Sequence, residues 1–204
     1  MQHTIIRVLV ITNGKPEKEA GQTVTGWDVN AKVSFSGEKT ARHLCSRIKE
    51  VIPHCQVFGG SPLRKAQETI FAIMDEMGVK KSDYASHMHL DTAFWSLSTD
   101  VWHLQCRPSE YSNRKVYGYR PDAIENEGRS VLNATIRLQE IAKAACSDSA
   151  IAVSHRGPLD AAIMVAKRLL GQKVKIGNVR QCEGAIFHFG AFNKILRVED
   201  FLRE

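Results

Sequence analysis

The chain has 204 residues, of which 43% are hydrophobic and 25% charged, a balance typical of one folded domain with a sizeable core. That balance argues against disorder, and no apolar stretch approaches the ~18 residues of a membrane span. The formal net charge is +6. Its positive residues are scattered, so a solvated basic surface explains the charge better than a nucleic-acid site does.

The cysteines and histidines form no pattern typical of a metal site or a disulfide framework. The five cysteines are widely spaced and include no Cys-x-x-Cys pair, which favours reduced thiols in a cytoplasmic protein. His87 and His89 alternate on one strand face without a nearby carboxylate or thiol, a pattern more typical of surface histidines than of metal ligands. We therefore predict no metal, no cofactor, no signal peptide and no membrane association.

The first half of the chain predicts two strands and two helices. Residues 5–11 are a continuous apolar run rich in β-branched side chains, which predicts a strand buried on both faces. Apolar residues at helical spacing predict a helix that begins at Ser36-Gly37 and ends before Pro53. A short strand follows at 56–59. The next helix is predicted to take Ser61 as its N-cap, Pro62 as its first residue and Gly78 as its end.

The second half predicts an irregular insertion and then a return to alternating strands and helices. Residues 79–125 are the least regular part and are interpreted as a lid-like insertion. Helices are expected at 127–145 and 158–170, a strand at 150–154, and a closing hairpin at 185–189 and 195–198. This alternation predicts a single α/β domain over 1–204, a three-layer sandwich whose central sheet is mainly parallel and flanked by helices.

Ligands bind beyond the carboxyl ends of the strands in such sheets. Thr12-Asn13-Gly14 follows the first strand, and Ser154-His155 follows a later one. Both segments are therefore expected to face one crevice.

Three segments in this order carry a family resemblance. Residues 9–14 read Leu-Val-Ile-Thr-Asn-Gly, residues 61–69 read Ser-Pro-Leu-Arg-Lys-Ala-Gln-Glu-Thr, and residues 153–157 read Val-Ser-His-Arg-Gly. They resemble the histidine phosphatase superfamily, which has the phosphoglycerate mutase-like fold and writes the first two segments as Leu-Val-Arg-His-Gly and Ser-Pro-Leu-x-Arg-Ala-x-Gln-Thr. Weaker similarities at 33–41 and 125–130 extend the resemblance over almost the whole chain.

The resemblance implies a phosphate site that has lost its nucleophile. In the family, two arginines and two histidines hold the phosphate, and one histidine attacks phosphorus. Asn13 occupies the position of the attacking histidine, and Thr12 that of the preceding arginine. The amide nitrogen lone pair of asparagine is delocalised, so Asn13 can donate a hydrogen bond but cannot attack phosphorus. Threonine offers one neutral hydroxyl in place of a charged, bidentate guanidinium.

The general acid of the family is also displaced. The family places this acid in a Leu-x-Glu segment, which resembles Leu90-Asp91-Thr92 here. Thr92 then takes the acid position. Asp91 lies one residue away, and in a strand that offset turns a side chain to the opposite face.

Three positions of the family pattern are retained: His155, Gly14, and Arg64, which is matched with an offset of one residue. Arg64 and His155 each lie beside a predicted helix start, which favours an anion.

These residues favour a degenerate histidine phosphatase-like protein, a pseudophosphatase that binds a phosphorylated small molecule or inorganic anion through Arg64, His155, Asn13 and Gly14. One alternative is an active phosphomonoesterase or mutase that uses a non-standard nucleophile, such as Thr12 or water activated by His155. A second alternative is a basic scaffold or a nucleic-acid-binding protein. The sequence leaves the oligomeric state open, and a homodimer is among the options.

Overall fold

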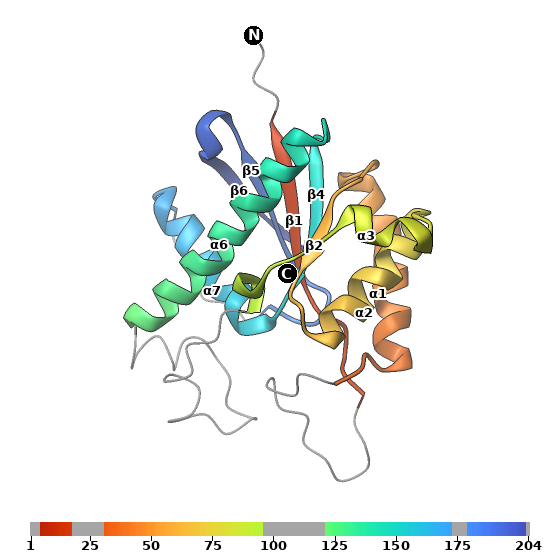
Figure 1. Cartoon of the computed structure of the whole chain (residues 1–204). Coiled ribbons are helices and arrows are strands. Elements are labelled where there is room, and N and C mark those ends of the chain that lie inside the picture. Colours follow the sequence, from red (N-terminus) through yellow and green to blue (C-terminus); the bar gives the residue numbers. More distant parts are fainter. Residues whose placement is uncertain (1–4, 18–30, 96–120, 173–178, 203–204) are drawn as a thin grey trace.

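Six strands form one mixed sheet in the spatial order β3–β2–β4–β1–β5–β6 (Figure 1). The computed structural model describes residues 5–17, 31–95, 121–172 and 179–202. Parallel pairings join the first four strands of that order, whereas β5 and β6 add an antiparallel hairpin. The predicted mainly parallel sheet is confirmed. The strands are β1 (Ile6–Thr12), β2 (Phe58–Gly60), β3 (Met88–Leu90), β4 (Ser149–Ser154), β5 (Gly184–Phe189) and β6 (Ile195–Phe201).

Helices pack on both faces of this sheet, which confirms the predicted three-layer sandwich. The pair α1–α2 covers one face and the pair α6–α7 covers the other (Figure 1). The long helices are α1 (Phe35–Val51), α2 (Arg64–Met77), α6 (Pro121–Ala144) and α7 (Arg156–Leu169). Short elements complete the described chain: η1 (Lys81–Asp83), α3 (Tyr84–His87), η2 (Thr92–Trp95) and η3 (Ala191–Asn193).

Strand β1 is buried on both faces because its apolar side chains alternate between two cores. Val8 and Val10 belong to the core with α6 and α7, and Leu9 and Ile11 belong to the core with α1 and α2. All four side chains are fully buried, and each such burial is worth about 1.5–3 kcal/mol of transfer free energy. This packing holds β1 in place, and therefore also positions the residues that follow the strand.

Most element boundaries differ from the sequence prediction by one to three residues; helix α7, for example, begins at Arg156 rather than at residue 158. The boundaries of α2, α6 and β2 matter most for the site. Helix α2 begins at Arg64 with Leu63 as its N-cap, because the Ser61 hydroxyl accepts a bond from the Leu63 N–H at 3.2 Å and makes a long-range contact instead of capping the helix. Helix α6 begins at Pro121, six residues earlier than expected. Strand β2 is shifted to Phe58–Gly60. Of the predicted insertion at 79–125, residues 81–95 form short elements and residues 96–120 lie outside the described part.

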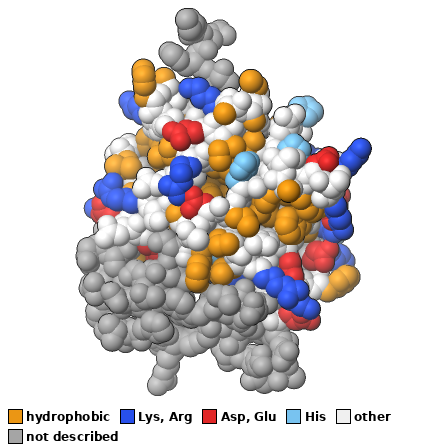
Figure 2. Space-filling model, in the orientation of Figure 1, with side chains coloured by type: hydrophobic (Ala, Val, Ile, Leu, Met, Phe, Trp, Pro, Cys, Tyr) orange, Lys and Arg blue, Asp and Glu red, His pale blue; other side chains and the backbone are white. Residues whose placement is uncertain are grey.

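The surface shown in Figure 2 mixes charges of both signs. Lysine and arginine side chains alternate with aspartate and glutamate over the described part of this face, and apolar side chains gather toward its centre. The ion pairs between α1 and α2 and along α6 are examples of this mixing. None of the described helices has both the length and the apolar character needed to cross a bilayer.

Candidate functional site

The ends of β1, β2 and β4 meet at one edge of the sheet. The parallel register pairs Thr12 with Ser154 and Gly60 with Val153, so the residues that follow, Asn13, His155 and Ser61, emerge together. Backbone bonds continue this pairing, with the Asn13 N–H donating to Ser154 O at 3.0 Å. Likewise, the Ser61 N–H donates to Val153 O at 2.9 Å.

A directional hydrogen-bond chain joins the three side chains. The Nδ2 of Asn13 donates to Gly14 O at 2.8 Å, which turns the Asn13 Oδ1 toward the Nδ1 of His155 at 3.0 Å. Nδ1 must then carry the ring proton, because amide oxygen is an acceptor only. The remaining nitrogen, Nε2, accepts from the Ser61 hydroxyl at 2.8 Å. Asn13 and Ser61 therefore hold His155 as one neutral tautomer.

The surroundings of His155 favour the same neutral form. The residue is 8% exposed. Burial lowers the pKa of His155 to about 3, and the positive charge of Lys65 acts in the same direction. His155 is therefore neutral at physiological pH and contributes no positive charge to an anion.

This serine–histidine–asparagine order resembles the order of groups in a nucleophilic triad. Ser61, however, is fully buried, and its oxygen already accepts the Leu63 N–H. An electrophile therefore cannot reach the Ser61 oxygen in this arrangement.

Gly14 links the end of β1 to α2. Its N–H donates to the Thr69 hydroxyl at 3.0 Å, and that hydroxyl donates to Lys65 O at 2.7 Å. A β-carbon at Gly14 would lie 3.0 Å from Gly37 O, so the loop after β1 also packs closely against the start of α1. These contacts with α2 and with the start of α1 hold the Gly14 backbone in place.

Replacing Thr69 with valine is expected to destabilise the protein by about 1–3 kcal/mol, because the buried Gly14 N–H would lose its acceptor. Urea unfolding of the purified variant measures this loss. Thr40→Val is the matched control: the Thr40 hydroxyl bonds to Ser36 O at 2.9 Å on an exposed helix face, so its change should stay within about 0.5 kcal/mol. Equal losses in both variants would contradict a structural role for Thr69.

Thr12 does not present its hydroxyl as a nucleophile. Its side chain is 1% exposed, and its Oγ1 donates to Arg180 O at 2.5 Å, in the loop before β5. The Thr12 N–H also donates to Glu183 O at 2.9 Å. In the part of the chain that the structure describes, no basic side chain accepts the Thr12 proton.

The cation whose charge acts on His155 is Lys65, not Arg64. The Arg64 side chain is 48% exposed, and its Nε pairs with Glu68 Oε1 at 2.7 Å. Lys65 is 4% exposed, and its charge lowers the pKa of His155. Sequence reasoning missed Lys65, although the signal was present. Aligned without an offset, the family segment places its arginine at Lys65 and its threonine at Thr69.

Among the residues described, the Asp91 carboxylate makes contacts that hold the local structure. One oxygen of Asp91 accepts from the Ala93 N–H at 2.8 Å, and the other pairs with Arg137 on α6, whose Nε lies 2.8 Å away. Thr92 is exposed and opens η2. No hydrogen bond joins either residue to Asn13 or His155 within 5–17, 31–95, 121–172 and 179–202, so the acid position stays a prediction.

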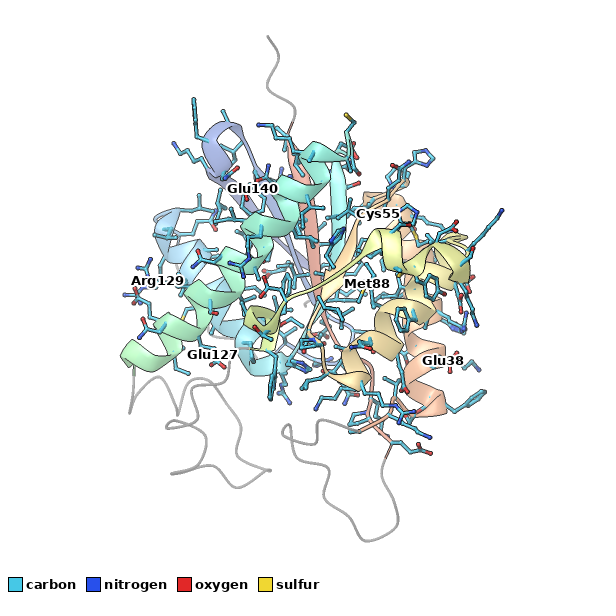
Figure 3. All side chains as sticks on the ribbon, viewed as in Figure 1. Glu38, Cys55, Met88, Glu127, Arg129 and Glu140 are labelled. Carbon is cyan, nitrogen blue, oxygen red and sulfur yellow. The ribbon has the colours of Figure 1, made fainter. Side chains whose placement is uncertain are left out.

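A buried acid lies elsewhere, on α6. The segment 125–130, expected ahead of the long helix, forms part of α6 itself. Glu127 is 2% exposed and lies in the part of α6 near α7 and η2, whereas Arg129 reaches solvent and pairs with Glu125 at 2.7 Å (Figure 3). Sequence reasoning did not single out Glu127 as a buried carboxylate.

Among the comparisons with known proteins, only those with solved structures found similar proteins. No family model matches the sequence, and neither does any curated protein. Phosphoglycerate mutase from Bacillus anthracis str. Sterne has a TM-score of 0.67 at 16% identity, covering 97% of this chain and 93% of that one. Phosphoserine phosphatase from Entamoeba histolytica has a TM-score of 0.63 at 16% identity, covering 98% of each chain. The alpha-ribazole phosphatase from Shigella flexneri has a TM-score of 0.58 at 15% identity, covering 95% of each chain.

These structural neighbours are histidine phosphatase superfamily proteins. At such identities the similarity establishes the fold, and the chain therefore has the phosphoglycerate mutase-like fold. The resemblance seen in the sequence is confirmed at this level. The neighbours also span nearly the same length of chain, so the fold is matched as a whole.

Proposed function

We propose that this protein is a histidine phosphatase-like pseudoenzyme that binds an anion, such as a phosphorylated small molecule, without phosphohistidine turnover. The observation that carries the proposal is the position of Asn13, whose amide oxygen faces the Nδ1 of His155 at 3.0 Å. A carboxamide in this place accepts and donates hydrogen bonds but has no lone pair for phosphorus. Thr12, bonded to Arg180 O, supplies neither a nucleophile nor a guanidinium.

Two features support anion binding at the same place. Helix α7 begins directly after His155, and α2 begins at Arg64, shortly after Ser61. The side chains of Ser61 and His155 are 2.8 Å apart, so the two helix starts lie near each other. Helix N-termini favour negative charge. The buried ammonium of Lys65 adds a full positive charge beside them. We therefore assign the main cationic role to Lys65, with Arg64 at the exposed rim.

The chemistry is tested by incubating the purified protein with acetyl phosphate and measuring its intact mass, alongside p-nitrophenyl phosphate turnover. We expect no phosphoryl adduct and no turnover above a buffer blank. An active phosphatase from the same fold, assayed in parallel, shows that both assays detect activity. Turnover at ordinary enzyme rates would overturn the proposal and favour the active alternative.

Anion binding is tested by calorimetric titration with inorganic phosphate. Lys65→Met is expected to weaken binding roughly 10–100-fold, the value of one charged hydrogen bond. Lys65→Arg keeps the charge and should keep the binding. Arg64→Met, the matched control on the preceding residue, should change it about twofold or less, since exposed ion pairs contribute little. If all three variants bind phosphate as the wild type does, or if the wild type does not bind it, the site assignment is wrong.

A further inference from the structure

The two edges of the sheet are built differently. Strand β3 at one edge has three residues and leads directly into Asp91 and η2. Strand β6 at the other edge has seven residues and no proline, and among the described residues no strand pairs with its outer side. Proteins commonly shorten, break or cover an edge strand, because its unpaired N–H and C=O groups can pair with another chain. The β3 edge is protected in this way, and the β6 edge is a long pairing surface.

The side chains of β6 specify one way of pairing with a second copy. Arg197, Glu199 and Phe201 share one face of the strand, because successive side chains alternate after the register shift that follows Ile195. In an antiparallel pair related by a two-fold axis perpendicular to the sheet, each side chain and its copy lie on the same face. Side chains directly opposite each other across the pair must also share a face, so the axis has to pass through a residue position and not between two positions. If the axis passes through Val198, Arg197 of each copy lies opposite Glu199 of the other.

Neighbouring registers lack this complementarity. An axis through position 197 places Arg197 opposite its own copy, and an axis through position 199 places Glu199 opposite its own copy. Like charges directly opposite each other destabilise a strand pair, and opposite charges stabilise it. In the single chain, Arg197 and Glu199 contact each other along the strand, and His188 lies 3.1 Å from Glu199. Both charges are thus already positioned on the face that the register requires.

Exposed apolar side chains flank the same edge. Phe192, in η3 just before β6, is 99% exposed and has a φ of 57°. Its neighbour Asn193 fixes this turn by donating to Glu140 Oε1 at 2.6 Å. Leu196 is 45% exposed and Leu202 is 39% exposed. Antiparallel pairing brings the start of one β6 beside the end of the other, so Phe192 of one copy and Leu202 of the second lie at the same end.

We propose that β6 is the interface of a homodimer, in which two copies pair antiparallel about Val198 and continue the sheet through both subunits. A closed two-fold interface of this kind uses the same patch of each subunit. The proposal is independent of the anion site, because β6 lies at the sheet edge beyond β5 and contributes no residue to that site.

Sedimentation velocity over a range of concentrations tests the proposal. The wild type is expected to sediment as a dimer, twice the 22.8 kDa of the chain. Arg197→Glu and Glu199→Arg each place two like-charged pairs across the axis, and each should weaken self-association by about tenfold or more. The double variant Arg197→Glu/Glu199→Arg exchanges the signs and should restore the dimer.

Mixing the two single variants isolates the pairing from any effect on the single chain. In the mixed dimer, positions 197 and 199 are both acidic in one subunit and both basic in the other, so every pair across the axis joins opposite charges. An equimolar mixture should therefore form heterodimers, while each variant alone remains monomeric. Circular dichroism verifies that both variants are folded. A monomeric wild type at about 100 µM, or single variants that dimerise as the wild type does, would overturn the proposal.

Discussion

Replacing Gly60 with alanine is expected to destabilise the protein by about 3 kcal/mol or more. Gly60 ends β2 with a φ of 152°, a backbone conformation essentially restricted to glycine. An added β-carbon would lie 2.4 Å from Val153 O and 3.0 Å from Val153 N. Both are backbone atoms of the paired strand β4, so neither can move without displacing the strand. The conformational penalty and the clash, each about 1–3 kcal/mol, act together.

The clash would also reach the candidate site. The N–H of Ser61, the next residue, donates to Val153 O, and the Ser61 hydroxyl holds the Nε2 of His155. Separation of β2 from β4 should therefore lengthen the Ser61–His155 contact. Urea unfolding measures the stability loss, and the His155 ring resonances in NMR spectra of the folded variant report the change at the site.

Gly78→Ala is the control for this prediction. Gly78 also has a positive φ, 86°, but a β-carbon there would meet no atom within 4 Å. Its replacement should cost only about 1 kcal/mol, the conformational part alone. A loss of equal size in the two variants would show that the contact with Val153 has no effect.

The positions of Asn13 and His155 could be predicted because they depend on local signals. Each follows a run of apolar residues long enough to mark a buried strand, and parallel strands end at the same edge of a sheet. The structure accordingly brings the two side chains to 3.0 Å. The pattern of β1, apolar on both faces, was sufficient to indicate helices on each side of the sheet.

The pattern of charges alone could not show which of Arg64 and Lys65 is buried beside His155. Adjacent residues in a helix are rotated by about 100°, so one residue decides between solvent and interior. The residue at which α2 begins decides which of the two side chains is buried. That start depends on Ser61, whose hydroxyl bonds to His155 rather than capping the helix. A contact across 94 residues thus overrides a local capping preference. Similarly, Asp91 is held by Arg137, 46 residues later.

Lowering the pH from about 7.5 to about 5 is expected to remove about 2 kcal/mol of stability through His155 alone. Burial lowers the pKa of His155 in the folded protein to about 3, with a further contribution from the charge of Lys65. In the unfolded chain, this histidine titrates near its ordinary pKa of 6.5. Between these values the unfolded state binds a proton that the folded state does not bind. The stability is therefore complete above about pH 6.5 and falls as the pH drops toward 3.

His155→Gln removes the titrating group, so the pH dependence of the unfolding free energy should flatten by nearly that amount, whatever the stability of the variant at neutral pH. The measurement is urea unfolding of both proteins at the two pH values. His89→Gln is the matched control. Burial also lowers the pKa of His89, but this residue is only half-buried on the edge strand β3, so its replacement should change the pH dependence less than His155→Gln does. A wild type and a His155→Gln variant with the same pH dependence would mean that His155 titrates alike in the folded and unfolded states, and is therefore protonated in the folded protein at about pH 5. The hydrogen-bond chain from Ser61 to Asn13 would then have to run differently, because a charged imidazole donates from both nitrogens.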